Sequence, residues 1–477
     1  MSYPTSLFID GTWRPSATGQ TFPVVNPATE DVLAEVASAS PADGMAALDA
    51  AHRAAESWAE TPVRVRADYL ARAFDAVTAR ADDFARCMTL EMGKPLDQAY
   101  AEVTYGAEFL RWFAESAPHA HGASYPTPEG GVHVLTLKRP VGPCLFITPW
   151  NFPLAMATRK IAPALAAGCT CVLKPSDATP LTSLLLAEVF DQIGLPAGVV
   201  NVVPTADTPP MTGPMIADPR LRKISFTGST GVGRALLREA AENVLRTSME
   251  LGGLAPFIVF EDADLALAVD AAIATKMRNM GEACNASSRF YVHRSLQAEF
   301  TSRLADAFAA MTVGDGMAEG VDVGPIISAK QRDHVADLVD RSVAAGGILR
   351  CGGQVPEGAG YFYPPTVIGD VAPDNPLMRE EVFGPVAAIC GFDDEDEVVR
   401  YANDTEFGLA GYVHTRDIGR IMRLARRLEV GMLGVNSGTI SNAAAPFGGV
   451  KASGLGREGG LEGIDEFEET IYVGLPR

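Results

Sequence analysis

Short apolar runs alternate with helical segments through the middle of the chain, between Gly142 and Phe260. The runs Cys144 to Thr148, Cys169 to Leu173 and Lys223 to Phe226 are strand-like, and segments of 3.6-residue periodicity separate them. Strand and helix in alternation indicate βαβ units on a parallel sheet, and such a sheet binds ligands beyond the carboxyl ends of its strands. The alternation therefore predicts an α/β fold with a ligand site at one edge of the sheet.

The alternation restarts after Gly252-Gly253, which predicts a second domain of similar design. A chain of 477 residues exceeds the usual size of a single core, so two or more domains are expected. Helical patterns cover residues 41–60 and 63 to about 115, with one break at Gly93-Lys94-Pro95. The tail from Thr470 to Leu475 is strand-like and has no local partner, so we expect it to pair with a distant part of the chain.

Charge and composition disfavour several classes of function. The formal net charge of −20 argues against unaided binding to nucleic acid or to anionic membranes, which requires clusters of Lys and Arg. No apolar run approaches the ~20 residues that span a bilayer, and the start, Met1 to Gly11, lacks the features of a signal peptide. The seven histidines form no i, i+4 pair that encloses a glutamate, so no metal site is expected. Scattered cysteines, seven in number, fit a reducing compartment, and a cytoplasmic protein is expected.

Cys284 is the strongest candidate for a nucleophile. It lies between a helical pattern, Leu265 to Met280, and the strand-like run Phe290 to His293, on the kind of loop that often carries catalytic residues. Its neighbours are small and polar, whereas the other six cysteines lie in apolar runs, in a helical pattern or before a Gly-Gly turn. The alternative is a small buried hydrophobic residue, because reactivity depends on a lowered thiol pKa that a sequence does not show.

Two strand ends carry residues that suit a dinucleotide. The segment Lys223 to Gly233 is typical of a strand, a Gly/Ser/Thr turn and a helix start, which presents N–H groups to an anion such as a pyrophosphate. At Lys174-Pro175-Ser176-Asp177 an ammonium and a carboxylate leave a strand together, which suits ribose hydroxyls. Neither segment matches the spaced Gly-x-Gly-x-x-Gly fingerprint, so plain β–α turns remain the alternative.

Seven motifs, in order along the chain, are similar to those of one family. They are Thr148 to Pro153, Lys174 to Asp177, Phe226 to Thr230, Met249 to Gly253, Gly281 to Cys284, Glu380 to Pro385 and Pro446 to Gly449. Over essentially its whole length the sequence resembles the aldehyde dehydrogenases. Within that family, Leu254 to Phe260 and Gly448 to Gly459 resemble the succinate-semialdehyde dehydrogenase branch.

The resemblance implies an α/β fold of three parts. A Rossmann-like NAD-binding domain would comprise residues 1–118 and 142–251, and a second α/β domain, the catalytic one, residues 252–445. Residues 119–141 and 459–477 would form a small β element for oligomerisation. Family members are homodimers or homotetramers that such an element bridges, so a homo-oligomer is expected.

The resemblance also implies a catalytic set. Cys284 as thiolate would attack the carbon of a small aldehyde, while the side-chain amide of Asn151 and the backbone N–H of Cys284 hold the oxyanion. Glu250 would act as the general base that activates water to hydrolyse the thioester. The alternative for Glu250 is a charge at a strand end, but a carboxylate in an apolar run calls for a reason.

The cofactor implied by the resemblance is NAD, with NADP possible. Lys174 and Asp177 would meet the adenosine ribose, Ser229 the pyrophosphate, and Glu381 with Phe383 the nicotinamide ribose and ring. Asp177 stands where NAD-preferring members usually have glutamate, and its carboxylate should still repel a 2′-phosphate. The other expected cofactor-binding residues are Thr148, Trp150, Ser176, Gly228 and Leu251.

For the substrate, the resembling branch holds a far carboxylate with two arginines and a serine, which correspond to Arg159, Arg278 and Ser441. Arginine suits this task because its planar fork meets a carboxylate with two hydrogen bonds. The alternative is that both arginines are salt-bridge partners on helix surfaces. The chain departs from the family at Glu282, where many members have glutamine, and at Ala286, where some have a cysteine for a disulfide switch, so no such switch is expected.

Several alternatives stay open. Glutarate semialdehyde is the nearest rival substrate, since one methylene is worth only ~1–3 kcal/mol of discrimination, and a broader aldehyde range is also possible. A CoA-acylating enzyme is disfavoured by Glu250, because that chemistry needs no water-activating base. A cofactor-free thiol esterase that uses Cys284 and a non-catalytic binding protein are disfavoured by the cofactor motifs.

Overall fold

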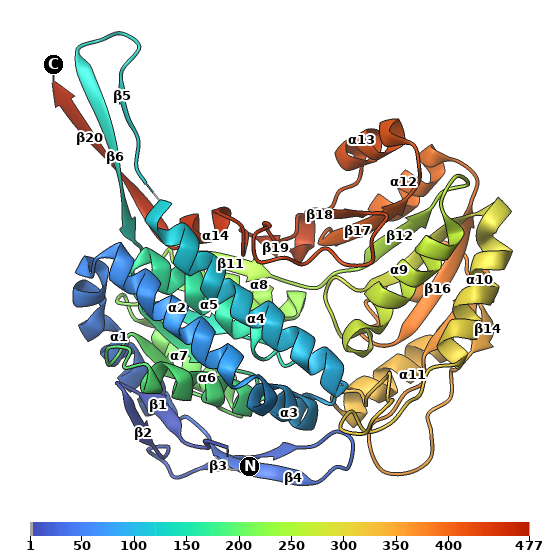
Figure 1. The fold of residues 1–477 in the computed structure, drawn as a ribbon, viewed down its shortest axis with the longest axis horizontal. Coiled ribbons are helices and arrows are strands. Elements are labelled where there is room, and N and C mark those ends of the chain that lie inside the picture. Colours follow the sequence, from blue (N-terminus) through green and yellow to red (C-terminus); the bar gives the residue numbers. More distant parts are fainter. Residues whose placement is uncertain (1–2, 120, 477) are drawn as a thin grey trace.

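A computed structural model describes residues 3–119 and 121–476. Two lobes stand side by side, and an arm of β-strands projects from the first of them (Figure 1). The parts of the expected domain ranges that fall on residues 1, 2, 120 and 477 lie outside the described residues, and the domain division stays a prediction. Within the described ranges no helix is both long and apolar enough to cross a membrane.

The first lobe is built on an eight-stranded sheet of order β19-β11-β10-β7-β8-β9-β1-β2. Its strands are β1 (Leu7–Ile9), β2 (Thr12–Arg14), β7 (Cys144–Ile147), β8 (Cys171–Lys174), β9 (Val200–Val202), β10 (Lys223–Thr227), β11 (Arg246–Glu250) and β19 (Gly454–Leu455). The five strands from β11 to β9 are parallel, as the alternation predicts. The chain order reverses between β7 and β10, and such a switch point is where open α/β sheets bind ligands.

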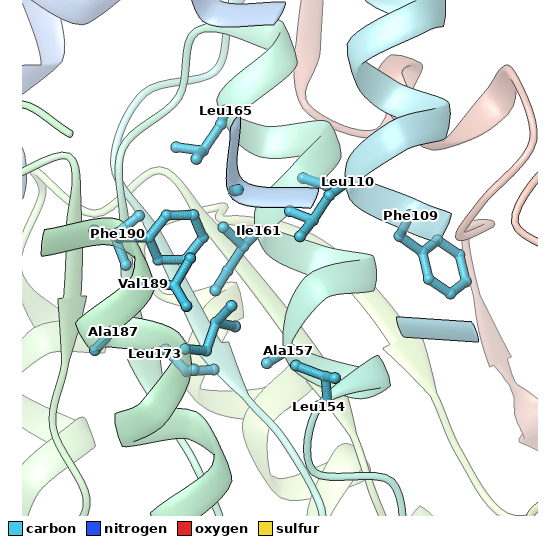
Figure 2. Packing of buried hydrophobic residues seen from close by; sticks show 14 of the residues in the cluster. Phe109, Leu110, Leu154, Ala157, Ile161, Leu165, Leu173, Ala187, Val189 and Phe190 are labelled. Carbon is cyan, nitrogen blue, oxygen red and sulfur yellow. The ribbon is translucent and has the colours of Figure 1, made fainter. Parts of the chain in front are cut away.

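Helices cover both faces of this sheet (Figure 1). They are α1 (Pro41–Glu60), α2 (Val63–Ala79), α3 (Ala81–Met92), α4 (Leu96–Ser116), α5 (Ala155–Ala167), α6 (Pro180–Gln192), α7 (Thr208–Ala217) and α8 (Thr230–Ala241), with the 3₁₀ turn η1 (Ala117–His119). Helices α2 to α6 share one apolar cluster with β7 and β8, whereas α1, α7 and α8 pack in another. Figure 2 shows α5 at the centre of the larger cluster, with Leu110 of α4, Leu173 of β8 and Phe190 of α6 around it.

The second lobe repeats the design on a seven-stranded sheet of order β14-β15-β16-β13-β12-β17-β18. Its strands are β12 (Ala255–Val259), β13 (Ser287–His293), β14 (Ile348–Cys351), β15 (Thr366–Gly369), β16 (Val386–Phe392), β17 (Ala410–His414) and β18 (Met432–Val435). Its helices are α9 (Leu265–Met277), α10 (Arg294–Ala309), α11 (Ala329–Ala344), α12 (Glu395–Asn403) and α13 (Ile418–Arg427), with 3₁₀ turns η2 (Arg278–Gly281) and η3 (Pro376–Met378). All its strands except β14 run parallel to their neighbours.

The projecting arm joins the end of the chain to its middle. It consists of β5 (Ser124–Pro126), β6 (Val132–Pro140) and β20 (Glu468–Pro476), in the order β20-β6-β5. Strand β20 pairs with β6 antiparallel along its whole length, from Glu468 opposite Pro140 to Pro476 opposite Val132. The expectation that the tail pairs with a distant segment is therefore confirmed. The remaining elements are the hairpin β3 (Thr21–Val25) and β4 (Val32–Ala37), the turn η4 (Lys451–Ser453) and α14 (Glu462–Asp465).

Two helices differ from the prediction. The helical pattern from 63 to about 115 breaks at Arg80 as well as at Gly93-Lys94-Pro95, because Arg80 leaves helical geometry between α2 and α3. Arg80 is neither Gly nor Pro, so nothing in the local sequence marks this break. Helix α7 was not predicted because three prolines lie within its ten residues, two of them in the first turn, where the missing N–H costs nothing.

A buried ion pair joins Lys94, which lies between α3 and α4, to Glu102 of α4. Glu102 of α4 also accepts hydrogen bonds from the backbone N–H groups of Leu154 and Ala155, so it caps the start of α5. The Lys94 ammonium donates to the carbonyl oxygen of Asn151 at 2.8 Å and lies 4.3 Å from the ring centre of Phe152. The pair therefore fixes the loop between β7 and α5.

Replacing Lys94 with Met should destabilise the protein strongly. The change leaves the Glu102 carboxylate buried without its cation, and breaking a buried pair in this way costs ~3–5 kcal/mol. Differential scanning fluorimetry should show the apparent Tm falling by at least ~6 °C. The matched control is Arg303→Ala, which breaks an exposed pair with Glu299 and should shift the Tm far less. Equal shifts in the two variants would contradict the role given to Lys94.

Candidate active site

One cavity lies between the two lobes, where residues that follow strands of the first sheet meet residues that precede strands of the second. Twelve of the sequence-predicted residues line it. They are Trp150, Asn151, Arg159, Gly228, Ser229, Glu250, Leu251, Arg278, Cys284, Glu381, Phe383 and Ser441. The other four, Thr148, Lys174, Ser176 and Asp177, lie outside its lining, at or just after the carboxyl ends of β7 and β8.

The cavity has further walls that the sequence prediction missed. They include Tyr105, Phe152, Met156, Asn285, Gln331, His334 and Phe447. Phe152 and Phe447 stand inside quoted motifs and Asn285 follows Cys284, so their position in the sequence could have suggested them. Tyr105, Gln331 and His334 lie on α4 and α11, where a helical pattern gives no sign of which residue faces a ligand.

The loop that carries Cys284 is sharply bent. After α9 ends at Met277, Asn279, Met280 and Gly281 adopt positive φ angles of 54°, 53° and 75°. At Gly281 a Cβ would lie 2.2 Å from the Gly384 carbonyl oxygen, so no other residue fits that position without a shift. At Gly253 a Cβ would lie 2.3 Å from the Cys284 carbonyl oxygen, so the nucleophile loop and the end of β11 are in direct contact.

Hydrogen bonds hold this loop against the first lobe. The side-chain amide of Asn151 donates to the Glu282 carbonyl oxygen at 2.9 Å. Asn279 donates from its amide to the carbonyl oxygens of both Glu282 and Asn151, each at 3.0 Å. The Asn151 amide contacts Glu282, two residues before Cys284, and has a second N–H. It is therefore placed to donate to the oxyanion of a carbonyl group that the sulfur has attacked.

Cys284 is half-buried in this cavity. Burial raises the pKa of its thiol to about 12, which the Arg159 guanidinium partly offsets and the Glu250 carboxylate reinforces. At neutral pH the sulfur is therefore a thiol in the protein as it stands, and attack on a carbonyl requires a base or a change in its surroundings. Sulfur, amide and carboxylate nevertheless converge on one cavity.

Glu250 is the buried carboxyl group at the end of β11. Neither of its carboxyl oxygens has a hydrogen-bond partner among the described residues. Burial raises its pKa well above the usual value, and the neighbouring Glu458 raises it further, against the opposing effect of Arg159 and Lys160. A desolvated acid without a partner, in a cavity with a thiol, is a typical acid–base candidate.

The residues predicted to bind a dinucleotide have the positions and charges that such a ligand requires. Ser229 caps α8 by accepting a hydrogen bond from the Val232 N–H, and the start of this helix adjoins the cavity. The Lys174 ammonium is largely buried and makes no hydrogen bond or ion pair with any described residue, while Asp177 nearby is exposed. A buried, unpartnered cation beside an exposed carboxylate suits the hydroxyls of a ribose.

The opposite end of the expected cofactor site is lined by Glu381 and Phe383. Glu381 accepts a hydrogen bond from the Gly253 N–H at 3.1 Å, and burial raises its pKa to about 7 against the effect of that hydrogen bond and of Lys276. The rings of Phe383 and Trp150 meet edge to face with centres 5.5 Å apart. The cavity thus offers a carboxyl group and an aromatic wall next to Cys284.

The two arginines of the cavity differ in their partners. The Arg159 guanidinium forms a buried ion pair with Glu458 at 2.5 Å, and Lys160 shares the same carboxylate. Arg278 has no ion-pair partner in the described part of the chain, and its guanidinium lies 4.9 Å and 5.4 Å from the ring centres of Phe152 and Tyr105. The unpaired positive charge that faces the cavity is therefore that of Arg278.

Two parallel-stranded α/β lobes, with a thiol, a carboxyl group and an amide at their junction, define a cofactor-dependent α/β enzyme. The chain belongs to the aldehyde dehydrogenase family, and the sequence model of that family matches residues 13–473. The family, the α/β fold and the enzyme class predicted from the motifs are confirmed. The prediction of NAD, with NADP as the other possibility, agrees with the nicotinamide cofactors of this family.

Characterised relatives cover nearly the whole chain. A succinate-semialdehyde dehydrogenase of Paenarthrobacter nicotinovorans is 56% identical over 93% of this chain and 99% of its own. An Escherichia coli succinate-semialdehyde dehydrogenase named for NADP⁺ and a glutarate-semialdehyde dehydrogenase of Pseudomonas aeruginosa are each 44% identical, over 98% of this chain and 96% and 97% of theirs. The crystal structure of succinate-semialdehyde dehydrogenase from Burkholderia pseudomallei superposes with a TM-score of 0.98 at 43% identity and covers 100% of this chain and 98% of that one.

The pKa of Cys284 can be tested by alkylation. Since the thiolate is the reactive form and its pKa is about 12, the rate of reaction with iodoacetamide in the cofactor-free protein should rise ~10-fold per pH unit from pH 8 to pH 10. Mass spectrometry of the Cys284 peptide measures the rate, and Cys284→Ala reports the background from Cys351, the other half-buried thiol. A rate that levels off below about pH 9 would contradict the raised pKa.

Proposed function

We propose that this protein oxidises succinate semialdehyde to succinate with a nicotinamide cofactor. The observation that carries the proposal is the unpaired Arg278 guanidinium, which lines the same cavity as Cys284 and Glu250. A short aldehyde with a carboxylate at its far end can place its carbonyl carbon at the sulfur and its negative charge at the arginine. The 56% identity to a succinate-semialdehyde dehydrogenase supports the same substrate.

The residues act in sequence on that substrate. The Cys284 thiol first loses its proton to a base. Its sulfur then forms a bond to the carbonyl carbon, and the carbonyl oxygen becomes an oxyanion that the Asn151 amide stabilises. The hydride leaves the same carbon as the oxyanion collapses to the C=O of a thioester, and a bound nicotinamide cofactor would supply the acceptor for that hydride. Glu250, in its ionised form, then takes a proton from the water that attacks the thioester carbon. The carbon–sulfur bond breaks, the Cys284 sulfur leaves as the thiolate, and the carboxylate product is released.

The far carboxylate meets Arg278 and Ser441 in this proposal. Arg159 contributes less than Arg278, because its guanidinium is already engaged in the ion pair with Glu458. The alternative that Arg159 is a salt-bridge partner on a helix surface does not hold either, because its side chain is only 1% exposed. The role of Arg159 is to hold Glu458 near Glu250 and to pack on Phe447, whose ring centre lies 4.2 Å from the guanidinium.

The assembly and location are also proposals. The projecting arm exposes Tyr125, Leu137, Tyr472 and Leu475, and apolar side chains exposed together favour burial against another copy of the chain. This supports a homodimer or homotetramer. Seven free cysteines support a reducing, cytoplasmic compartment.

Glutarate semialdehyde is the second candidate substrate. The Pseudomonas aeruginosa relative is named for this aldehyde, and it is as similar to this chain as the Escherichia coli succinate-semialdehyde dehydrogenase is, at 44% identity. The thiol-esterase and binding-protein alternatives lose ground because neither accounts for the buried Lys174 ammonium, which has no hydrogen-bond or ion-pair partner among the described residues. The CoA-acylating alternative is disfavoured by the unpartnered Glu250 carboxyl group in the cavity.

Arg278→Ala should raise the KM for succinate semialdehyde far more than that for butanal, which has the same chain length and no charge. Loss of a hydrogen-bonded charge pair corresponds to a ~10- to 150-fold fall in kcat/KM for the acid. NADH absorbance with both aldehydes measures the effect, and Arg303→Ala is the surface control. Equal changes for the two aldehydes would remove the carboxylate site, and no NADH from any aldehyde would remove the proposed function.

NAD should be used better than NADP. The exposed Asp177 carboxylate at the end of β8 repels a 2′-phosphate, so Asp177→Asn should raise the NADP:NAD ratio of kcat/KM by about 10-fold, equivalent to ~1.4 kcal/mol. Initial rates at varied cofactor concentration measure the ratio. A wild-type protein that uses NADP at least ~10-fold better than NAD would overturn the preference.

A further inference from the structure

Asn285, the residue after Cys284, carries a polar side chain into the same cavity. Its side-chain amide nitrogen donates a hydrogen bond to the Ser441 hydroxyl oxygen at 3.0 Å. Its backbone carbonyl oxygen accepts a hydrogen bond from the Tyr412 hydroxyl at 2.9 Å, and the residue is 7% exposed. Asn285 is therefore held from both its backbone and its side chain, between the nucleophile and Ser441.

The direction of this hydrogen bond decides what Ser441 can do. A serine hydroxyl has one hydrogen to donate and can accept hydrogen bonds at its lone pairs. Because Asn285 acts as the donor, the Ser441 hydrogen is not used in the bond between them. The Ser441 hydroxyl donates to no other described residue, and Ser441 lines the cavity, so its hydrogen is available to an acceptor there.

We propose that Asn285 is a positioning residue that makes Ser441 a hydrogen-bond donor toward the far carboxylate of the substrate. The proposal rests on the proposed function, and it concerns aldehydes with a terminal carboxylate. If the amide were turned over, its oxygen would accept the Ser441 hydrogen and leave the carboxylate facing only oxygen lone pairs. Aspartate, which at neutral pH can only accept, therefore removes the donation to Ser441 in the observed orientation but would keep the acceptor of the reversed one.

A double-mutant cycle tests the proposal in the full-length protein with NAD. Wild type, Asn285→Leu, Ser441→Ala and the double variant are assayed with succinate semialdehyde and with butanal. We expect each single change to lower kcat/KM for the acid by ~5-fold, mainly through KM, and the double variant to be no worse than Ser441→Ala. A merely structural role for Asn285 would change kcat, and would affect both aldehydes alike.

The kinetics of the Asn285→Asp variant give a second test of the positioning role. Since aspartate accepts the Ser441 hydrogen and adds a negative charge beside the carboxylate site, it should lower kcat/KM for the acid more than Asn285→Leu does. Asn285→Ser, which shortens the side chain and keeps it polar, repeats the cycle if leucine disturbs the loop. Alkylation of Cys284 at a wild-type rate in each variant shows that the loop is intact.

Additive effects of the Asn285 and Ser441 changes, or an Asn285→Asp variant with wild-type kinetics, would overturn the positioning role and leave the proposed function standing. A wild-type protein that shows no preference for succinate semialdehyde over butanal would overturn both. The wild-type kinetics thus separate failure of the proposed function from failure of the Asn285 role.

Discussion

The buried ion pair between Lys94 and Glu102 is the interaction on which the geometry of the cavity depends. Glu102 caps α5, which carries Arg159 and Lys160, and Lys94 holds the backbone of Asn151 in the loop that precedes this helix. Asn151 in turn holds the Cys284 loop of the second lobe through the Glu282 carbonyl oxygen. One pair of opposite charges, taken out of water, thus sets where the two lobes meet. Such a pair is costly to bury but far more costly to break, so it enforces one arrangement.

Desolvation also sets the chemistry of the groups that the pair positions. Burial is the largest cause of the raised pKa values of Cys284, Glu250 and Glu381. Cations reduce the penalty where they are close, and Arg159 lowers the pKa of both Cys284 and Glu250, although it is also paired with Glu458. The same burial that disfavours ions makes the acid–base groups responsive to a bound charge. A carboxylate substrate at Arg278 and a cofactor at Glu381 therefore enter a site whose proton positions are easily changed.

The fold could be predicted from the sequence where a local pattern and a global constraint agree. Alternation of strands and helices gave both parallel sheets, and the lone tail strand implied a distant partner, because an unpaired strand is unstable alone. Sequence motifs named nine cavity residues, since chemistry fixes both residue type and spacing there, and the resemblance to one branch of the family named three more, Arg159, Arg278 and Ser441. Tyr105 and His334 were missed because each lies on a long helix and faces the cavity only through tertiary packing. The ion pair of Arg159 with Glu458 joins positions far apart in the chain, and no local pattern encodes it.

Glu282 shows how a departure from a family pattern can preserve its physics. Its side chain is fully buried, and one carboxyl oxygen accepts a hydrogen bond from the Ile327 N–H at 3.2 Å while the other has no partner among the described residues. Burial raises its pKa well above the usual value, which favours the neutral acid form. A neutral carboxylic acid has the shape and charge of the glutamine that many family members carry. The pKa of Glu282 is higher in the folded state than in the unfolded state. The contribution of its proton to the stability of the fold is therefore complete in acid and is lost as the pH rises through the folded-state pKa. The loop beside Cys284 therefore keeps glutamine-like geometry only while that proton stays bound.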